Sequence, residues 1–438
     1  MNKEALKQAA LDFIEADSET LMEYGRTLFS TPEPGFREEK TSRLVKSALE
    51  DCGLSVRDGI ALTGLKAKAE GANHQANVAV MGELDCLIMP THPKAQPETG
   101  YYHGCGHHAQ LTTILGVAMG LVKSGLIKEL DGDVTFIGVP AEEVIELEYR
   151  SDLIKQGRIE FMSGKQELIR LGEFDDVDMV LCSHAMGKSE AAGSWLGHSW
   201  NGVIHKSVQY TGRSAHAGLA PERGINALQA ALMGMNGVNA LRERFRDEDH
   251  VRIHYIITKG GSSPNIVPDD VRMEFGVRAA SVESIKTANE QVNGALRLGG
   301  EAVGAGVNVN DYGMYLPCHQ SRALGEIFLK NAENLIGPEN VHNCFAEHRG
   351  SSTDCGDVAS LLPLIHPYFG GAVGVPHGLD FDIVNDYAAY VVPAKLAAAT
   401  VIDLLWDGAA LAKKVRAEFR PDFGSKEEYL EFSRTVLA

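Results

Sequence analysis

The stretch that decides the fold reads Val134-Thr-Phe-Ile-Gly-Val-Pro-Ala-Glu-Glu143, an apolar run followed at once by two adjacent carboxylates. A short continuous apolar run bounded by turn residues is typical of a strand buried on both faces. The run Asp178-Met-Val-Leu-Cys-Ser ends in the same way at His184, and Ala76-Asn-Val-Ala-Val-Met-Gly ends at Glu83 and Asp85. Because ligands bind at the carboxyl ends of strands in open α/β sheets, we expect these polar side chains to share one edge.

Working outward, strands alternate with helical segments, which predicts an α/β fold with a mostly parallel sheet. Helical periodicity covers most of residues 1–51, and residues 111–124 form a further apolar helix. A chain of 438 residues is too long for one ordinary core. We therefore expect a catalytic domain built from residues 1–200 and 316–438, interrupted by a second domain over 201–315.

The pattern of residues 201–315 differs from that of the flanking parts. Lys206-Ser-Val-Gln-Tyr-Thr-Gly-Arg alternates like a half-exposed strand, and residues 251–258 and 270–278 resemble antiparallel strands. Helical segments over 225–241 and 282–298 lie between them. This strand-helix-strand-strand-helix-strand order predicts a ferredoxin-like α+β insertion.

Composition narrows the class of partner. The formal net charge of −18 disfavours nucleic acid or an anionic membrane, although a local basic pocket could hold a small anionic substrate. Seven cysteines without a regular framework favour reduced thiols and a cytoplasmic location. The N-terminus has no apolar signal core, and the apolar stretch 111–122 is too short to cross a bilayer.

The clusters at the strand ends carry donor types that suit a metal ion. Cys105 and His107 form a Cys-x-His pair in a glycine-rich turn, and His184 adds an imidazole. Of the adjacent Glu142 and Glu143, one could bind a metal while the other accepts a proton from water. Each signal alone has an ordinary explanation: a cysteine buried for packing, solvated loop glutamates, or a histidine satisfied by a backbone carbonyl. A hydrolase with Cys105 as nucleophile is a further alternative, which chelator sensitivity would separate.

Taken together, the local motifs resemble the M20 family of metallopeptidases and amidohydrolases, in particular its acyl-amino-acid and aminobenzoyl-glutamate hydrolase branch. The resembling segments follow in family order almost from end to end: Gly82-Glu-Leu-Asp85, His103-Gly-Cys-Gly-His107, Pro140-Ala-Glu-Glu143, Ser183-His184, Gly212-Arg-Ser-Ala-His-Ala217, Gly260-Gly-Ser-Ser-Pro-Asn-Ile-Val-Pro268, Ser352-Thr-Asp354 and Pro376-His377.

The resemblance implies a role for each matching residue. One or two divalent transition metal ions, zinc or manganese, would be held by Cys105, His107, Glu143, His184 and His377. Glu142 would be the general base, and Asp85 would orient a ligand imidazole. Residues 201–315 would form a lid that also makes a homodimer, with His216 on the developing oxyanion and Asn265 and Arg278 on polar groups of a small anionic substrate.

The favoured reaction is hydrolysis of a non-peptide C–N bond, most simply the amide of a small N-acyl or N-aroyl amino acid. Two departures keep an alternative open: His108 follows the ligand histidine where Asp or Asn is usual, and the segment 86–100 is long. A related branch replaces the amino group of a nitro-aromatic acid, such as 5-nitroanthranilate, with hydroxyl. A catalytically silent relative that only binds or assembles is the remote alternative.

Overall fold

The computed structural model describes residues 1–437, which separate into two compact units. The first comprises Met1–His198, His319–Glu347 and Val358–Lys426. The second comprises Ser199–Cys318, His348–Asp357 and the segment from Glu427 onward. Each unit is described by itself.

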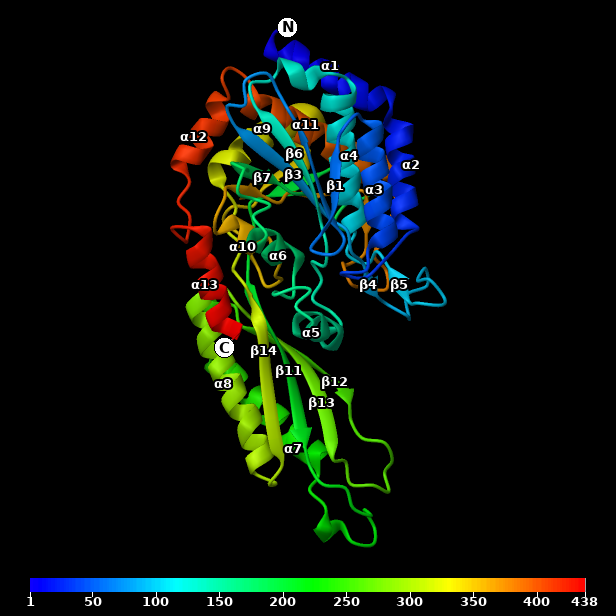
Figure 1. The fold of residues 1–438 in the computed structure, drawn as a ribbon, viewed down its shortest axis with the longest axis vertical. Coiled ribbons are helices and arrows are strands. Elements are labelled where there is room, and N and C mark those ends of the chain that lie inside the picture. Colours follow the sequence, from blue (N-terminus) through cyan, green and yellow to red (C-terminus); the bar gives the residue numbers. More distant parts are fainter. Residues whose placement is uncertain (438) are drawn as a thin grey trace. The chain divides into compact units, whose positions relative to one another are not determined.

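A mostly parallel sheet forms the centre of the first unit (Figure 1). Strands β6, β3, β7 and β17 run parallel, while β1 and β2 add an antiparallel edge. Every residue of β3 and β6 is buried, which explains their continuous apolar sequences. The sheet order is β1 (Val56–Ile60), β2 (Gly64–Ala69), β6 (Asp133–Val139), β3 (Asn77–Glu83), β7 (Met179–Leu181) and β17 (Leu364–Ile365).

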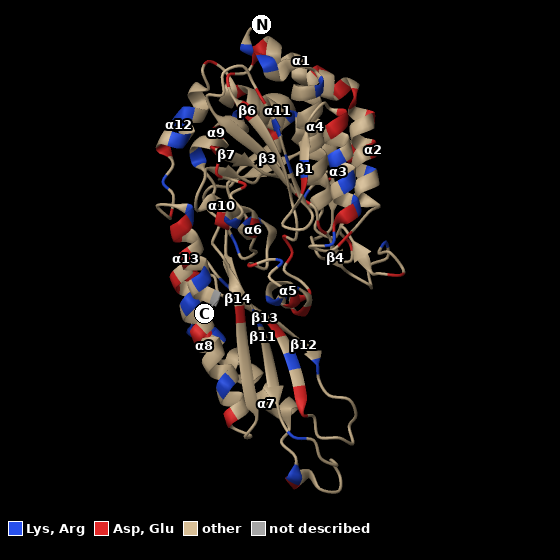
Figure 2. Cartoon of the chain, viewed as in Figure 1, with Lys and Arg blue, Asp and Glu red and all other residues tan. Residues whose placement is uncertain are grey.

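Helices cover this sheet, and α4 and α11 make the central contacts with it and with each other. The helices of the first unit are α1 (Lys3–Ala16), α2 (Ser18–Phe29), α3 (Glu39–Asp51), α4 (His107–Ala118), η1 (Met119–Lys123), η2 (Leu126–Glu129), α5 (Leu147–Lys155), α6 (Gly164–Arg170), α9 (Arg322–Ile336), η6 (Pro338–Asn340), η7 (Tyr387–Val391), α11 (Val392–Leu405) and α12 (Ala410–Glu418). The surface helices α1, α2, α3 and α12 carry both signs of charge interspersed (Figure 2).

The continuous helix Tyr387–Leu405 is long and apolar enough, by length and composition, to cross a membrane. Its most apolar window is completely buried inside the structure, as is common for a core helix. Each fully buried Leu, Val or Ile contributes roughly 1.5–3 kcal/mol to folding. We therefore regard this helix as the main apolar support of the first unit.

Short strands form the rim of the same unit. A small sheet has the order β15 (Val341–Asn343), β9 (Ser194–Leu196), β18 (Tyr368–Phe369) and β8 (His184–Ala185). Two further pairs are β4 (Leu87–Ile88) with β5 (Tyr101–Tyr102), and β19 (Ala372–Val373) with β20 (Asp382–Ile383).

The second unit has the predicted strand-helix-strand-strand-helix-strand order, with an antiparallel sheet covered on one face. Buried and half-buried residues alternate along β13, as in a sheet with one covered face. Its main elements are β11 (Gly202–Thr211), η3 (Pro221–Arg223), α7 (Ala227–Leu241), η4 (Arg242–Arg244), η5 (Asp247–Asp249), β12 (Arg252–Lys259), β13 (Asp270–Ala279), α8 (Val282–Glu301) and β14 (Gly306–Tyr315). Strand β10 (Ser199–Trp200) pairs with β16 (His348–Arg349).

Residues 348–357 and the segment from Glu427 onward belong to the second unit, whereas all of 316–438 was predicted to belong to the catalytic domain. Within that unit, the Tyr429 hydroxyl of α13 (Lys426–Leu437) donates to Asp357 over 2.8 Å, and Lys286 of α8 lies over the Phe432 ring. Asp357 belongs to α10 (Cys355–Ala359). Such contacts between distant segments leave no periodic signal in a single sequence.

Candidate metal centre

The edge of the main sheet gathers the polar residues that follow its strands. Strands β3 and β6 are in register, with Glu83 opposite Val139, so their carboxyl ends lie at the same level. Glu142 and Glu143 follow β6, while β7 leads to His184 in β8.

Five donor side chains converge at this edge. Cys105 Sγ lies 3.4 Å from His184 Nε2 and 3.4 Å from His377 Nε2. His377 Nε2 is in turn 2.9 Å from a Glu143 oxygen. Two groups, each with its donor atoms within 4.8 Å of one another, share the cysteine: Cys105, His107 and His184, and Cys105, Glu143 and His377.

These separations suit metal coordination. Donors bound tetrahedrally to zinc at about 2.0–2.3 Å lie roughly 3.5 Å from each other. One thiolate, three imidazoles and a carboxylate are also the donor types that bind divalent transition metals. The residues present therefore fit one or two such ions.

Hydrogen bonds at the opposite ring nitrogens orient two of the imidazoles. Asp85 Oδ1 lies 2.9 Å from His107 Nδ1, and its other oxygen accepts the Glu143 backbone N–H over 2.9 Å. The carbonyl of Ala185 lies 2.7 Å from His184 Nδ1. Nδ1 of each ring can thus donate a hydrogen bond, which leaves Nε2 facing the cluster, the orientation that ligand histidines adopt.

The cluster perturbs the ionisation of its own members. Burial and the Glu143 carboxylate oppose ionisation of the Cys105 thiol, but the three imidazoles outweigh them and lower its pKa to about 6. The Glu143 carboxylate, assisted by Cys105, raises the pKa of the half-exposed His377 to about 11. Negative donors are thus stabilised at the site, as a cation-binding site requires.

Glu142 lies beside the donors. It is 8% exposed, and one of its oxygens is 3.9 Å from His107 Nε2. Glu142, His107 and Glu83 also have donor atoms within 4.8 Å of one another. This carboxylate therefore lies directly beside the candidate metal ligands.

A buried ion pair next to His107 was not predicted from the sequence. Glu83 lies 3.1 Å from His107 Nε2 and accepts a hydrogen bond of 2.6 Å from the completely buried Lys165 of α6. Burial opposes ionisation of Glu83, but Lys165 and His107 outweigh it and hold its pKa well below the usual range. The position of Glu83 at the end of β3 was the one available signal.

Two further buried ionisable residues, Glu38 and Arg150, hold the turn that carries Glu142. Ala141 has a positive φ of 53°, a strained conformation for a residue with a Cβ. Its N–H donates to Glu38 over 2.7 Å, and its carbonyl accepts from Arg150 over 3.3 Å. Arg150 also donates to the carbonyls of Met162 and Glu143. The turn is therefore held from both sides.

The glycine-rich turn leads directly into a helix. His107 is the first residue of α4, whereas the sequence suggested a turn for it and a helix from 111. Gly106 caps the helix with φ of 84°, and a Cβ there would lie 3.1 Å from that of Ala185. His108 is completely buried, with its Nε2 3.1 Å from the Tyr390 hydroxyl. Its unusual presence is thus accounted for by core packing.

The long segment 86–100 forms a hairpin that contacts the His377 loop. Lys94 pairs with Asp382 at the end of that loop. The Tyr102 hydroxyl donates to the Phe381 carbonyl over 2.8 Å. The His377 N–H also donates to the Gly104 carbonyl over 2.9 Å, which joins both ligand loops.

The three predicted lid residues belong to the second unit. His216 and Asn265 are exposed on two loops joined by a bridge from His216 to Ile266 and by the Ala217 N–H to the Asn265 carbonyl, 2.9 Å. Arg278 is half-buried on β13. Their roles remain predictions.

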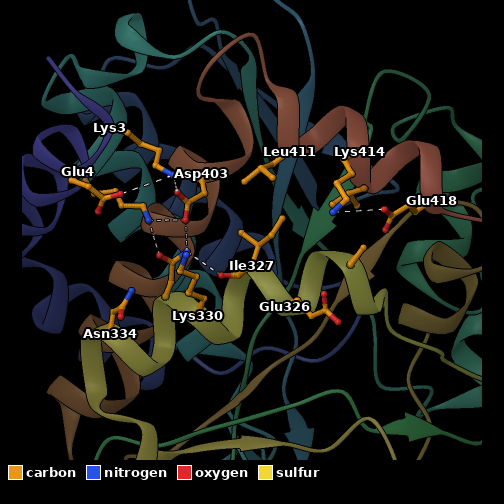
Figure 3. A pocket seen from close by; sticks show the side chains of 14 residues that line it. Lys3, Glu4, Glu326, Ile327, Lys330, Asn334, Asp403, Leu411, Lys414 and Glu418 are labelled. Carbon is orange, nitrogen blue, oxygen red and sulfur yellow. Dashed lines mark hydrogen bonds and ion pairs between the residues drawn. The ribbon is translucent and has the colours of Figure 1, made fainter.

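A separate pocket of about 300 Å³ lies between α1, α9, α11 and α12, and none of the metal-centre residues lines it (Figure 3). Asp403 at its base pairs with Lys3 at 2.8 Å and Lys7 at 2.6 Å, and Lys414 faces Glu418 at 3.9 Å. Because its charges compensate each other, we assign the chemistry to the sheet edge.

Comparisons with known proteins find a matching domain and several relatives. Residues 201–301 match the M20 peptidase dimerisation domain. The chain is 26% identical to mouse Xaa-Arg dipeptidase over 95% of its own length and 93% of that protein. It is 29% identical to a p-aminobenzoyl-glutamate hydrolase chain of Escherichia coli (strain K12), over 64% of this chain and 55% of that one.

A solved structure shares the fold. It is a dinuclear metal-binding peptidase of the M20 family from Bacillus subtilis, with a TM-score of 0.64 and 21% identity, covering 89% of this chain and 99% of that one. The matched dimerisation domain lies where the insertion was predicted, and the fold is that of a catalytic domain with an inserted lid. The chain is therefore a hydrolase that contains an M20 peptidase dimerisation domain and is similar to metallopeptidases and amidohydrolases of the M20 family.

Proposed function

We propose that this protein hydrolyses the amide bond of a small N-acyl or N-aroyl amino acid, with Glu142 as general base. The observation that carries the proposal is the pair of donor groups sharing Cys105, with the Glu142 carboxylate 3.9 Å from a ligand imidazole. Metal-dependent amide hydrolysis needs this combination of cation site and adjacent base.

Cys105, His107 and His184 would hold one ion, and Cys105, Glu143 and His377 a second, zinc or manganese. Such ions polarise a carbonyl and acidify water. Asp85 would keep Nε2 of His107 directed at the site. Glu142 would take the proton of the attacking water and deliver it to the departing amine, which must leave protonated.

The lid histidine has the tautomer that an oxyanion donor needs. His216 Nδ1 accepts the backbone N–H groups of Gly218 at 3.2 Å and Leu219 at 3.0 Å. In the neutral ring the proton therefore sits on Nε2, which can donate to the oxygen of a tetrahedral intermediate. Asn265 and Arg278 would bind the polar groups of the substrate.

Two relatives are named for substrates of the proposed kind, which supports an amide of an amino acid as the substrate. Xaa-Arg dipeptides and p-aminobenzoyl-glutamate share an amide whose nitrogen belongs to an amino acid. An amino-acid leaving group with a free carboxylate is also the small anionic substrate that the sequence analysis expects. The protein's net charge of −18 then requires a local cation such as Arg278 to bind it.

A homodimer through the lid is part of the proposal. Strand β12 is an edge strand of its sheet and exposes Ile256 and Ile257 at 60% and 42%. Exposed apolar residues on an unpaired edge favour pairing with a second chain. The match to a dimerisation domain supports the same assignment. Size-exclusion chromatography with light scattering at micromolar concentration should give twice the chain mass.

A cytoplasmic location is also proposed. All seven cysteines are free and buried, which agrees with a reducing compartment. Fractionation of the source cells, followed by immunodetection, tests this directly.

The decisive experiment compares Glu142→Gln with Glu143→Gln on a panel of acyl-amino acids, aroyl-glutamates, dipeptides and amino-nitrobenzoates. Glu142→Gln should keep metal and fold but lose about 10²–10⁴-fold in kcat, the range for loss of a general base. Glu143→Gln should lower metal occupancy instead. Reversed phenotypes would exchange the two roles, and near-normal turnover of Glu142→Gln would refute the mechanism. Turnover of amino-nitrobenzoates alone would identify an aryl aminohydrolase.

A further inference from the structure

A second group of metal-ligand side chains lies at the rim of the first unit, among residues to which the proposed reaction gives no role. His198, Cys344 and Glu347 have donor atoms that all lie within 4.8 Å of one another. The His198 Nε2 to Glu347 Oε2 distance is 3.2 Å. His198 is completely buried and Cys344 is 3% exposed, whereas the Glu347 side chain is 59% exposed.

The backbone that carries these residues is fixed by a parallel strand pair. Strands β9 and β15 run parallel, with Leu196 opposite Asn343. The Cys344 N–H donates to the Leu196 carbonyl over 2.7 Å, which extends the pairing by one residue. His198 and Cys344 thus follow the carboxyl ends of two neighbouring parallel strands, as the ligands of the main centre do.

Further hydrogen bonds hold the donors in place. The Glu347 N–H donates to the Cys344 carbonyl over 2.9 Å, a tight turn that returns the carboxylate to the cysteine. The Gln320 side chain donates to the His198 carbonyl over 2.9 Å. The donors therefore project from a preformed frame, and little ordering is needed for an ion to bind.

We propose that His198, Cys344 and Glu347 form a second, separate binding site for a divalent transition metal, with zinc as the best match. One imidazole, one thiolate and one carboxylate are zinc ligands, and three protein ligands leave the fourth tetrahedral position to water. The most distant donors need to approach by only about 1 Å to reach tetrahedral separations. The exposed carboxylate provides the route by which the ion enters.

The alternative is a simple contact between the imidazole and the carboxylate, with the thiol buried for packing. The two readings differ in stoichiometry. A metal site predicts an additional ion per chain that depends on Cys344 but not on Cys105. A packing contact predicts no such ion.

The test uses the full-length protein stripped with a chelator and titrated with Zn²⁺, with metal counted per chain by mass spectrometry. Cys344→Ser should bind one ion fewer than the parent while keeping kcat/KM within about twofold, because Cys344 has no part in the proposed reaction. Cys52→Ser, which removes another buried thiol of the same unit, is the matched control and should bind as the parent does. Equal zinc content in Cys344→Ser and the parent would overturn the proposal.

Glu347→Gln provides a variant that cannot fail through loss of core packing, because its side chain is exposed. It should weaken the affinity for the additional ion by roughly tenfold or more, and unchanged affinity would contradict the assignment. Cobalt gives an optical readout. A thiolate-to-cobalt charge-transfer band should remain in Cys105→Ser and disappear in Cys105→Ser/Cys344→Ser. Its absence from Cys105→Ser would also overturn the second site.

Discussion

Lys165 and Lys206 are both completely buried, one in each unit, and they differ in what their ammonium groups contact. Lys165 pairs with Glu83, which lies 3.1 Å from Nε2 of the proposed ligand His107. Lys206 belongs to β11, where it pairs with Asp311 of β14 at 3.0 Å and contacts the side-chain oxygens of Asn289 and Asn293 of α8. One buried cation thus lies beside the candidate metal centre, and the other lies in the core of the second unit.

This difference shows how the candidate functional side chains of each unit are positioned. In the first unit, buried charged residues contact the candidate functional side chains and hold them in position. In the second, the buried charge is enclosed in the fold, and the candidate functional residues His216 and Asn265 are exposed on loops. Substitutions in the two regions should therefore affect different observables.

Among the variants that test this comparison, the largest effect should come from an exposed lid residue. His216→Ala removes the proposed oxyanion donor, and kcat should fall about 10²–10³-fold with a much smaller change in KM, because such a donor acts mainly in the transition state. Steady-state kinetics on the best substrate measures it. His250→Ala, which alters another histidine of the same unit, is the control. An unchanged kcat for His216→Ala would contradict the proposed role of His216 as oxyanion donor.

Lys165→Met should come next. The change leaves the Glu83 carboxylate buried without its cation, which costs about 3–5 kcal/mol of folding free energy. Because Glu83 also contacts His107, metal affinity should fall about 10–100-fold. Denaturant unfolding and competition with a chelator measure the two effects. The pair variant Glu83→Gln/Lys165→Met should recover much of the stability, and a stable Lys165→Met with unaltered metal affinity would contradict the assignment.

Glu38 gives a pH-dependent effect in the same region. Burial, assisted by the Asp85 carboxylate, raises the pKa of Glu38 to about 7 from 4.5. The folded state therefore holds this proton more tightly than the unfolded state. The resulting stabilisation is complete below pH 4.5 and is lost as the pH rises to 7, a change of roughly 3 kcal/mol.

Glu38→Gln should remove that slope. The difference in unfolding free energy between the parent and the variant, measured by denaturant titration from pH 4.5 to 8, should change across this window and level off above it. If the unfolding free energies of the parent and Glu38→Gln changed in parallel with pH, Glu38 would keep its ordinary pKa.

The smallest effect should follow Lys206→Met. Asp311 is partly exposed and keeps its hydrogen bonds from Asn289 and Asn293, so the loss should be about 1–3 kcal/mol of unfolding free energy. Metal content and kcat/KM of the folded protein should stay within about twofold. A loss of metal in this variant would break the comparison, since it would link the lid core to the metal centre.

The sequence alone predicted the α/β class, the inserted ferredoxin-like domain and the family, because strand ends and motifs are local features. The donor positions Cys105, Glu143 and His184 were visible for the same reason. Lys165 was not, since a lysine in a short helix is usually exposed and its partner Glu83 is distant in sequence. Arg150 and Glu38 were missed likewise, because buried charges are recognised only when the tertiary partners are known.

The burial of all seven thiols has a practical consequence for spectroscopic work. A cysteine introduced on the surface would be the most accessible site for a maleimide dye, without prior removal of the native ones. Cys105 is the exception to watch, since its thiolate-favouring surroundings would make it reactive once exposed. Because the Cys105 sulfur would be protected while it binds the proposed metal ion, its rate of alkylation would measure how fast the metal is lost.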